Sequence, residues 1–160
     1  ARKRKNTRQL APPVSKALCV KKETEMIKGS CMCGEVTYEI HGKIGEITHC
    51  HCTTCRKAHG SAFSSVAAVQ INDFKFISGE NKIKCYQSSP DKVRCFCSNC
   101  GSHIYAHKND QKHYILRLGT LDDDPISRPT NHIWVSLKAP WYNIENDCKL
   151  PQHNTWADDR

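Results

Sequence analysis

Seven cysteines in three short-spaced groups are the residues of this chain best suited to chemistry. Cysteines two or three residues apart rarely bridge each other, because local backbone geometry seldom permits a disulfide. Their thiolates can, however, converge on one metal ion, and Zn²⁺ is the ion that suits this donor set. An odd total of eleven cysteines, with no secretory signal pattern, also argues against a secreted disulfide framework. The spacing therefore predicts metal binding by Cys31, Cys33, Cys50, Cys52, Cys55, Cys97 and Cys100.

The first predicted site combines a C-x-C pair with a distant C-x-x-C pair. Cys31 and Cys33 flank Met32, and in an extended chain both sulfurs would face one ion while Met32 points away. Cys97 and Cys100 have the form of a zinc knuckle. Glycines Gly34 and Gly101 follow the two pairs and allow unusual backbone turns there. Together the pairs predict a closed, four-cysteine structural zinc site made of Cys31, Cys33, Cys97 and Cys100.

The second predicted site has only three cysteines, Cys50, Cys52 and Cys55, in the segment THCHCTTCRK. Three protein ligands with one open position are typical of catalytic zinc. A tris-thiolate site is soft and suits a fourth sulfur, which it would hold as the nucleophilic thiolate. Arg56 and Lys57 follow directly and are weak candidates for binding an anionic thiol; an ordinary solvated basic pair is the alternative.

Other residues could close the second site or line it. His49 and His51 would point away from the sulfurs in an extended chain, so we expect ordinary polar roles for them. Cys95 or Cys85 could supply a fourth donor and make the site structural. His132 is a weak candidate for lining a pocket, although a hydrogen-bonded surface position is favoured.

The remaining cysteines and the tryptophans receive no catalytic role. Cys19 and Cys148 have no local partners and are assigned none. Trp134 and Trp141 are expected in the core rather than as a ligand platform.

Hydrophobic periodicity from Gly29 onward predicts mostly β structure. Apolar residues alternate with polar ones in short segments, and Asn-Asp, Ser-Gly and Ser-Pro turns separate them. A single helical turn is expected at Thr53-Thr54, with a hydroxyl as its cap. The segments expected to form strands are 36–40, 61–71, 74–76, 83–86, 93–97 and 114–118.

Charge divides the chain unevenly. Residues 1–30 hold nine Lys/Arg and two Glu out of a total formal charge of +8, so the remainder is nearly neutral. We expect a basic tail at 1–28, a zinc-binding domain at 29–145 and a C-terminal extension at 146–160. No apolar run approaches the ~18 residues of a membrane helix. An intracellular, most simply cytoplasmic, protein is expected; the tail also suggests nuclear localisation or binding to a polyanion such as nucleic acid.

The order C-x-C, HCHCTTCRK and CSNCGS resembles the family of glutathione-dependent formaldehyde-activating enzymes, which includes centromere protein V. The resemblance covers about residues 29–141, including TLDDDP and HIWVSLKAPW, and leaves out the tail. It implies an all-β fold of several small coiled antiparallel sheets held by zinc, shared with a small guanine-nucleotide-release protein. It also implies two zinc ions, with Cys31, Cys33, Cys97 and Cys100 on the structural one and the central three cysteines on the other.

The activity implied by the resemblance is that of a carbon–sulfur lyase, which joins glutathione and formaldehyde into S-hydroxymethylglutathione. The alternative hypothesis is a non-catalytic zinc scaffold whose basic tail contacts nucleic acid or another polyanion. The vacancy predicted beside Cys50, Cys52 and Cys55 favours the enzyme.

Overall fold

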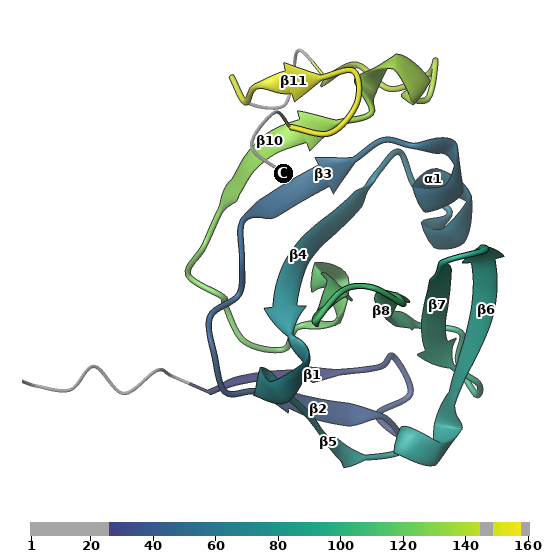
Figure 1. Cartoon of the computed structure of the whole chain (residues 1–160), viewed down its shortest axis with the longest axis vertical. Helices are drawn as coiled ribbons and strands as arrows, with labels where there is room; N and C mark the ends of the chain where they lie inside the picture. Colours follow the sequence, from purple (N-terminus) through teal and green to yellow (C-terminus); the bar gives the residue numbers. More distant parts are fainter. Residues whose placement is uncertain (1–25, 145–148, 158–160) are drawn as a thin grey trace, which may run out of the picture.

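The computed structural model describes residues 26–144 and 149–157 and consists mainly of β-strands (Figure 1). This agrees with the all-β class expected from the sequence. The basic residues 1–25, with Cys19, and also Cys148 lie outside the described residues. Within the described part, no helix combines the length and apolar character needed to cross a bilayer.

A small sheet and a large sheet make up the fold. The small sheet has the order β1-β2-β5, formed by Ile27–Ser30, Thr37–Ile40 and Phe74–Ser78. The large sheet has the order β11-β10-β3-β4-β9-β8-β7-β6. Its strands, in that order, are Gln152–His153, Pro129–Ile133, Ile47–Cys50, Ser64–Gln70, His113–Arg117, His103–Lys108, Lys92–Cys97 and Ile83–Ser89.

The pairing is antiparallel except at one edge of the large sheet. There β10 lies parallel to both β3 and β11, with His132 opposite His49 and Ile133 opposite Cys50. The expectation of antiparallel sheets alone was therefore incomplete, because β10 returns from a distant part of the sequence to pair with β3. Figure 1 shows β10 and β11 at the top of the view and β1, β2 and β5 at the bottom.

The main core lies between the small sheet and strands β4, β9, β8 and β7. Tyr38 stacks on Phe74 with ring centroids 4.7 Å apart, and its hydroxyl donates to the Thr120 carbonyl at 3.1 Å. Burying each large apolar side chain contributes about 1.5–3 kcal/mol. The first cysteine group adjoins this core, whose buried members are Cys31, Val36, Tyr38, Ile40, Val69, Phe74, Cys95, Cys97, Ile104, Tyr105 and Leu116.

One short α-helix, α1 (Thr53–His59), interrupts the strands where the sequence predicts a helical turn. Its cap differs from the expectation, because the Cys52 sulfur, rather than a threonine hydroxyl, accepts the Cys55 backbone N–H at 3.3 Å. Gly60 ends the helix in the left-handed conformation. The described part of the chain also contains the 3₁₀ turns η1 Ile71–Asp73, η2 Glu80–Lys82, η3 Leu118–Thr120 and η4 Val135–Leu137.

Both expected domain boundaries fall next to structured segments. Strand β1 begins at Ile27, two residues before the boundary expected at 29, and pairs with β2 from Ile27 to Ser30. Within the expected C-terminal extension, β11 pairs with β10 and Trp156 contacts Trp134 edge to face, with centroids 5.8 Å apart. Segments on both sides of the expected domain therefore contact its sheets.

Candidate metal centres and an adjoining cavity

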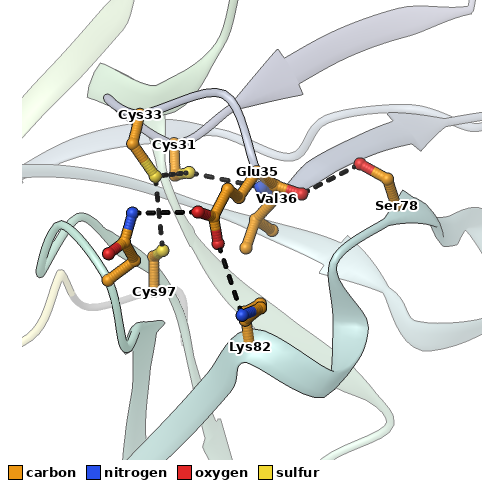
Figure 2. Close-up of polar contacts among 8 residues, drawn as sticks. Cys31, Cys33, Glu35, Val36, Ser78, Lys82 and Cys97 are labelled. Atoms are coloured by element: carbon orange, nitrogen blue, oxygen red, sulfur yellow. Dashed lines mark hydrogen bonds and ion pairs between the residues drawn. The ribbon is translucent and has the colours of Figure 1, made fainter.

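The first cysteine group brings together four sulfurs from two distant turns, as the sequence predicts. The Sγ atoms of Cys31, Cys33, Cys97 and Cys100 all lie within 4.8 Å of one another. Cys31 Sγ is 3.4 Å from Cys33 Sγ, which is 3.8 Å from Cys97 Sγ (Figure 2). A tetrahedral zinc about 2.3 Å from each sulfur requires sulfurs about 3.8 Å apart. The donor set and its spacing therefore fit a closed zinc site.

Backbone turns position these sulfurs, and Cys97 is also the last residue of strand β7. The Gly34 N–H donates to the Cys31 carbonyl at 2.9 Å, and the Gly101 N–H donates to the Cys97 carbonyl at 2.8 Å. Both glycines have positive φ, 77° and 78°, which confirms the expectation of unusual backbone at these positions. Met32 is 81% exposed and points away as expected, although it does so from a turn.

Neighbouring polar groups hold the two turns together. Ser102 Oγ accepts the Met32 N–H at 3.0 Å and lies 3.3 Å from Cys100 Sγ. Glu35 accepts from Asn99 of the knuckle and pairs with Lys82 at 3.8 Å (Figure 2). Hydrogen bonding with Ser102 lowers the pKa of Cys100 to about 5, whereas burial raises the pKa of Cys97 to about 11.

The second cysteine group joins the end of β3 to α1. The sulfurs of Cys50, Cys52 and Cys55 lie within 4.8 Å of one another. Cys50 and Cys55 are each 5% exposed, and they pack with Val66 and Ile133 in a second small core. Three converging sulfurs fit a zinc ion. No further Cys, His, Asp or Glu among the described residues joins this group within the same distance.

Cys85 and Cys95 do not complete the second group, so the hypothesis of a closed site through either of them is wrong. They face each other across β6 and β7 and form a disulfide, with Cα atoms 4.1 Å apart. Cys95 belongs to the main core and Cys85 is exposed. The sequence offered no spacing signal for this bridge, because it depends on the register of the two strands.

Two buried arginines beside the second group were not among the site residues predicted from the sequence. Arg94 on β7 and Arg117 on β9 are 5% and 3% exposed. Arg94 Nη2 lies 3.9 Å from Cys55 Sγ, and Arg117 Nη1 lies 3.4 Å from Ser64 Oγ. Hydrogen bonding with Cys50 and Cys52, followed by the charges of Arg117 and Arg94, lowers the pKa of Cys55. The site therefore favours thiolate there.

The sequence candidates for anion binding lie elsewhere. Arg56 is half-buried and Lys57 is exposed on α1, and neither lines the cavity described below. His132 is fully buried, so the favoured surface position was wrong; its Nδ1 lies 2.9 Å from His51 Nε2. His49 lies 3.0 Å from Ser65 Oγ through Nδ1. These histidines form a buried cluster with Phe63 instead of joining the sulfur group.

The tryptophans also differ from the expectation of core positions. Trp141 is 71% exposed, and Trp134 is only partly buried, with a left-handed backbone conformation at φ 58°.

A cavity of about 300 Å³ lies near the second group; none of the three cysteines lines it, but Ser64, which pairs with Cys50, does. His59, one helical turn after Cys55, lines it, and so does Arg117. Ser102 and His103, which follow the knuckle of the first group, also line it, and His103 is the first residue of β8. Residues associated with both cysteine groups therefore meet at one cavity.

The class of this protein is therefore a β fold with two cysteine-based candidate metal sites, one of four sulfurs and one of three, and a cationic cavity. The family model described as glutathione-dependent formaldehyde-activating enzyme matches residues 26–137. The chain belongs to this family.

Two known proteins give further comparisons. An uncharacterized lyase of Schizosaccharomyces pombe is 29% identical over 90 residues, which cover 56% of this chain and 64% of that protein. The match thus spans less than two thirds of that relative. The crystal structure of a Rhodobacter sphaeroides protein superposes with a TM-score of 0.51 at 18% identity, covering 78% of this chain and 98% of that one. This second likeness concerns the fold alone.

Proposed function

We propose that the protein is a zinc-dependent carbon–sulfur lyase that joins a small thiol such as glutathione to an aldehyde such as formaldehyde, giving S-hydroxymethylglutathione. The observation that carries the proposal is the three-sulfur group. Cys50, Cys52 and Cys55 converge without a fourth such donor among the described residues, beside a cavity large enough for a small ligand. Family membership supports the same activity.

The two cysteine groups have different roles in this proposal. The four-sulfur group would hold zinc as a structural ion that ties residues 31–33 to residues 97–100. Zinc held by Cys50, Cys52 and Cys55 would supply an open coordination position for a fourth sulfur and favour its thiolate form. That thiolate is the reactive nucleophile toward an aldehyde carbon.

The surrounding residues favour the negative charge that the reaction needs. Three thiolates on Zn²⁺ carry a net charge of about −1, and the Arg94 guanidinium lies close to Cys55. Because Arg94 is nearly fully buried, its charge acts with less screening than a surface charge. A positive environment of this kind lowers the cost of bringing a further thiolate to the site.

The bond changes are simple and reversible. In the forward direction the thiolate sulfur forms a bond to the aldehyde carbon, and the C=O π pair moves to oxygen, which takes a proton from solvent. In the lyase direction the hydroxyl gives its proton to solvent, the oxygen pair re-forms the C=O bond, and the C–S bond breaks as the thiolate leaves. Confining both reactants in one cavity removes much of the entropic cost of their encounter.

The test measures adduct formation from glutathione and formaldehyde by NMR exchange, with and without the zinc-loaded protein. We expect faster exchange with the protein, and loss of the acceleration in Cys52→Ala. Met32→Ala is the control, since Met32 is 81% exposed beside the other cysteine group, and should keep the acceleration. An exchange rate equal to the uncatalysed rate, in a protein holding two zinc ions, would refute the proposal.

A further inference from the structure

The cavity beside the three-sulfur group has a distinctive lining. Its charged residue is Arg117, and no Asp, Glu or Lys is among the residues that line it. Serine hydroxyls and two imidazoles provide most of the other polar groups, with Phe63 as an apolar wall. A cavity with one cation and no acid attracts an anion.

Arg117 carries a free hydrogen-bonding edge. Its Nη1 bonds Ser64 Oγ, whereas its Nε and Nη2 have no hydrogen-bond partner in the part of the chain that the structure describes. Nε and Nη2 form the side-on edge of a guanidinium, whose two parallel N–H bonds match the two oxygens of a carboxylate. The described residues include no carboxylate in an ion pair with Arg117.

Burial makes this free edge significant. Arg117 is only 3% exposed, so its two unpartnered nitrogens are shielded from bulk solvent. A buried charge without a hydrogen-bonded partner destabilises a protein, so an anion that completes these hydrogen bonds would be bound favourably. Arg94 differs, because it already contacts Cys55 and does not line the cavity.

Two histidines add neutral donors to the same cavity. His59 Nε2 and His103 Nδ1 are buried without hydrogen-bond partners among the described residues, and the two rings lie 5.0 Å apart. Burial, followed by the charge of Arg117, lowers the pKa of His59 to about 4, and burial also lowers the pKa of His103. Each neutral ring keeps one N–H that can donate to a bound anion.

We propose that this cavity is a carboxylate-binding site, in which Arg117 holds a carboxylate of the thiol ligand side-on and His59 and His103 lie beside it. The inference rests on the proposed function and extends it, because it makes the protein selective for acidic thiols over neutral ones. Arg117 shares the cavity with His59, which follows Cys55 by one turn of α1, so the ligand would extend its sulfur from this cavity toward the three-sulfur group.

The expected effect follows from the strength of a charge-assisted hydrogen-bond pair. Such a contact contributes about 1.5–3 kcal/mol, which corresponds to about 10- to 150-fold in affinity. We therefore expect loss of the carboxylate, or of the guanidinium edge, to weaken binding by at least about tenfold.

The experiment uses S-methylglutathione, whose sulfur is blocked, and measures its binding to the zinc-loaded protein by calorimetry. The matched probe without carboxylates is its dimethyl ester. The protein variants are Arg117→Gln and Gly119→Leu. Gly119 lines the cavity, and a Cβ there meets no atom within 4 Å, so the leucine adds bulk without removing the charge. Arg128→Gln is the control, because Arg128 is exposed and pairs with Asp124.

We expect the acid to bind at least about tenfold more tightly than the ester. Both cavity variants should weaken binding of the acid by a similar factor, and Arg128→Gln should change it less than about twofold. Equal binding of acid and ester, unchanged binding in the folded variants, or tighter binding of inorganic phosphate would overturn the proposal.

Failure of this inference is distinguishable from failure of the proposed function. In the Co²⁺-loaded protein, glutathione that enters the coordination sphere changes the absorption spectrum whether or not Arg117 is present. A spectral change without a preference for the acid would overturn only the carboxylate site. An Arg117-dependent preference for the blocked acid, with no spectral change on adding glutathione, would overturn only the thiol chemistry.

Discussion

Replacing Cys97 by serine removes one sulfur of the four-sulfur group and should destabilise the whole domain. Cys97 is fully buried in the main core. It connects the knuckle to the turn that carries Cys33, 64 positions away in the sequence, across a sulfur separation of 3.8 Å. Serine is a poor zinc ligand, so the variant should lose this metal-mediated link.

The loop that the link closes gives the expected magnitude. Closing a loop of 64 residues restricts the unfolded chain by about 4 kcal/mol in the chain-entropy treatment of cross-links. Small domains are stable by only about 5–15 kcal/mol, so this loss is a large fraction of the total. The bound metal ion would add its own binding free energy to the loss.

Urea unfolding followed by circular dichroism measures the change, and atomic absorption measures zinc per chain. We expect Cys97→Ser to lose at least about 4 kcal/mol and to hold one zinc ion instead of two. Met32→Ser, an 81% exposed position in the same turn as Cys33, is the control and should change stability by less than about 0.5 kcal/mol. A Cys97→Ser protein with two zinc ions and an unchanged unfolding midpoint would refute the reasoning.

Three further predictions concern the bridge, a turn and a buried tyrosine. Cys85→Ser opens a disulfide between residues 10 apart, so under non-reducing conditions it should cost about 2–3 kcal/mol in urea unfolding; no difference from the parent would show that the bridge does not form. Gly101→Ala should cost about 1–2 kcal/mol, because φ is +78° there although no atom obstructs the added Cβ; Gly119→Ala, which lacks a positive φ, is its control, and equal costs would contradict the argument. Burial raises the pKa of Tyr38 to about 12 from 10, so the unfolded state ionises first and stability should fall by about 2–3 kcal/mol between pH 10 and 12. Tyr38→Phe should remove that part of the fall, and an unchanged pH profile would contradict it.

The cysteine groups and their turns could be predicted because their information is local. The sulfur spacing in C-x-C and C-x-x-C restricts which sulfurs meet, and the glycines at 34 and 101 mark the positive φ values that the turns require. The alternation of apolar and polar residues predicted most of the strands, because it is also a pattern of neighbouring residues. These features depend on a few neighbouring residues, which a sequence shows directly.

The charged environment of the site could not be predicted in this way. Arg117 lies between Leu116 and Leu118, so strict alternation would have placed it on the solvent side. Its neighbours are distant in the sequence, since it bonds Ser64 and lines a cavity together with His59 and His103. The Cys85–Cys95 bridge and the parallel pairing of β10 with β3 likewise depend on register between distant segments. The cations that the sequence suggested for this site were Arg56 and Lys57, because they directly follow Cys55.

The central claim is that seven sulfurs divide four and three between two zinc ions, leaving one position for a thiol. X-ray absorption at the zinc edge, with zinc counted per chain, tests it most directly. For two zinc ions, we predict an average of about 3.5 sulfurs per zinc in the free protein, rising to about 4 when glutathione is added. An average already near 4 without glutathione, a value that glutathione leaves unchanged, or a single zinc per chain would contradict the account.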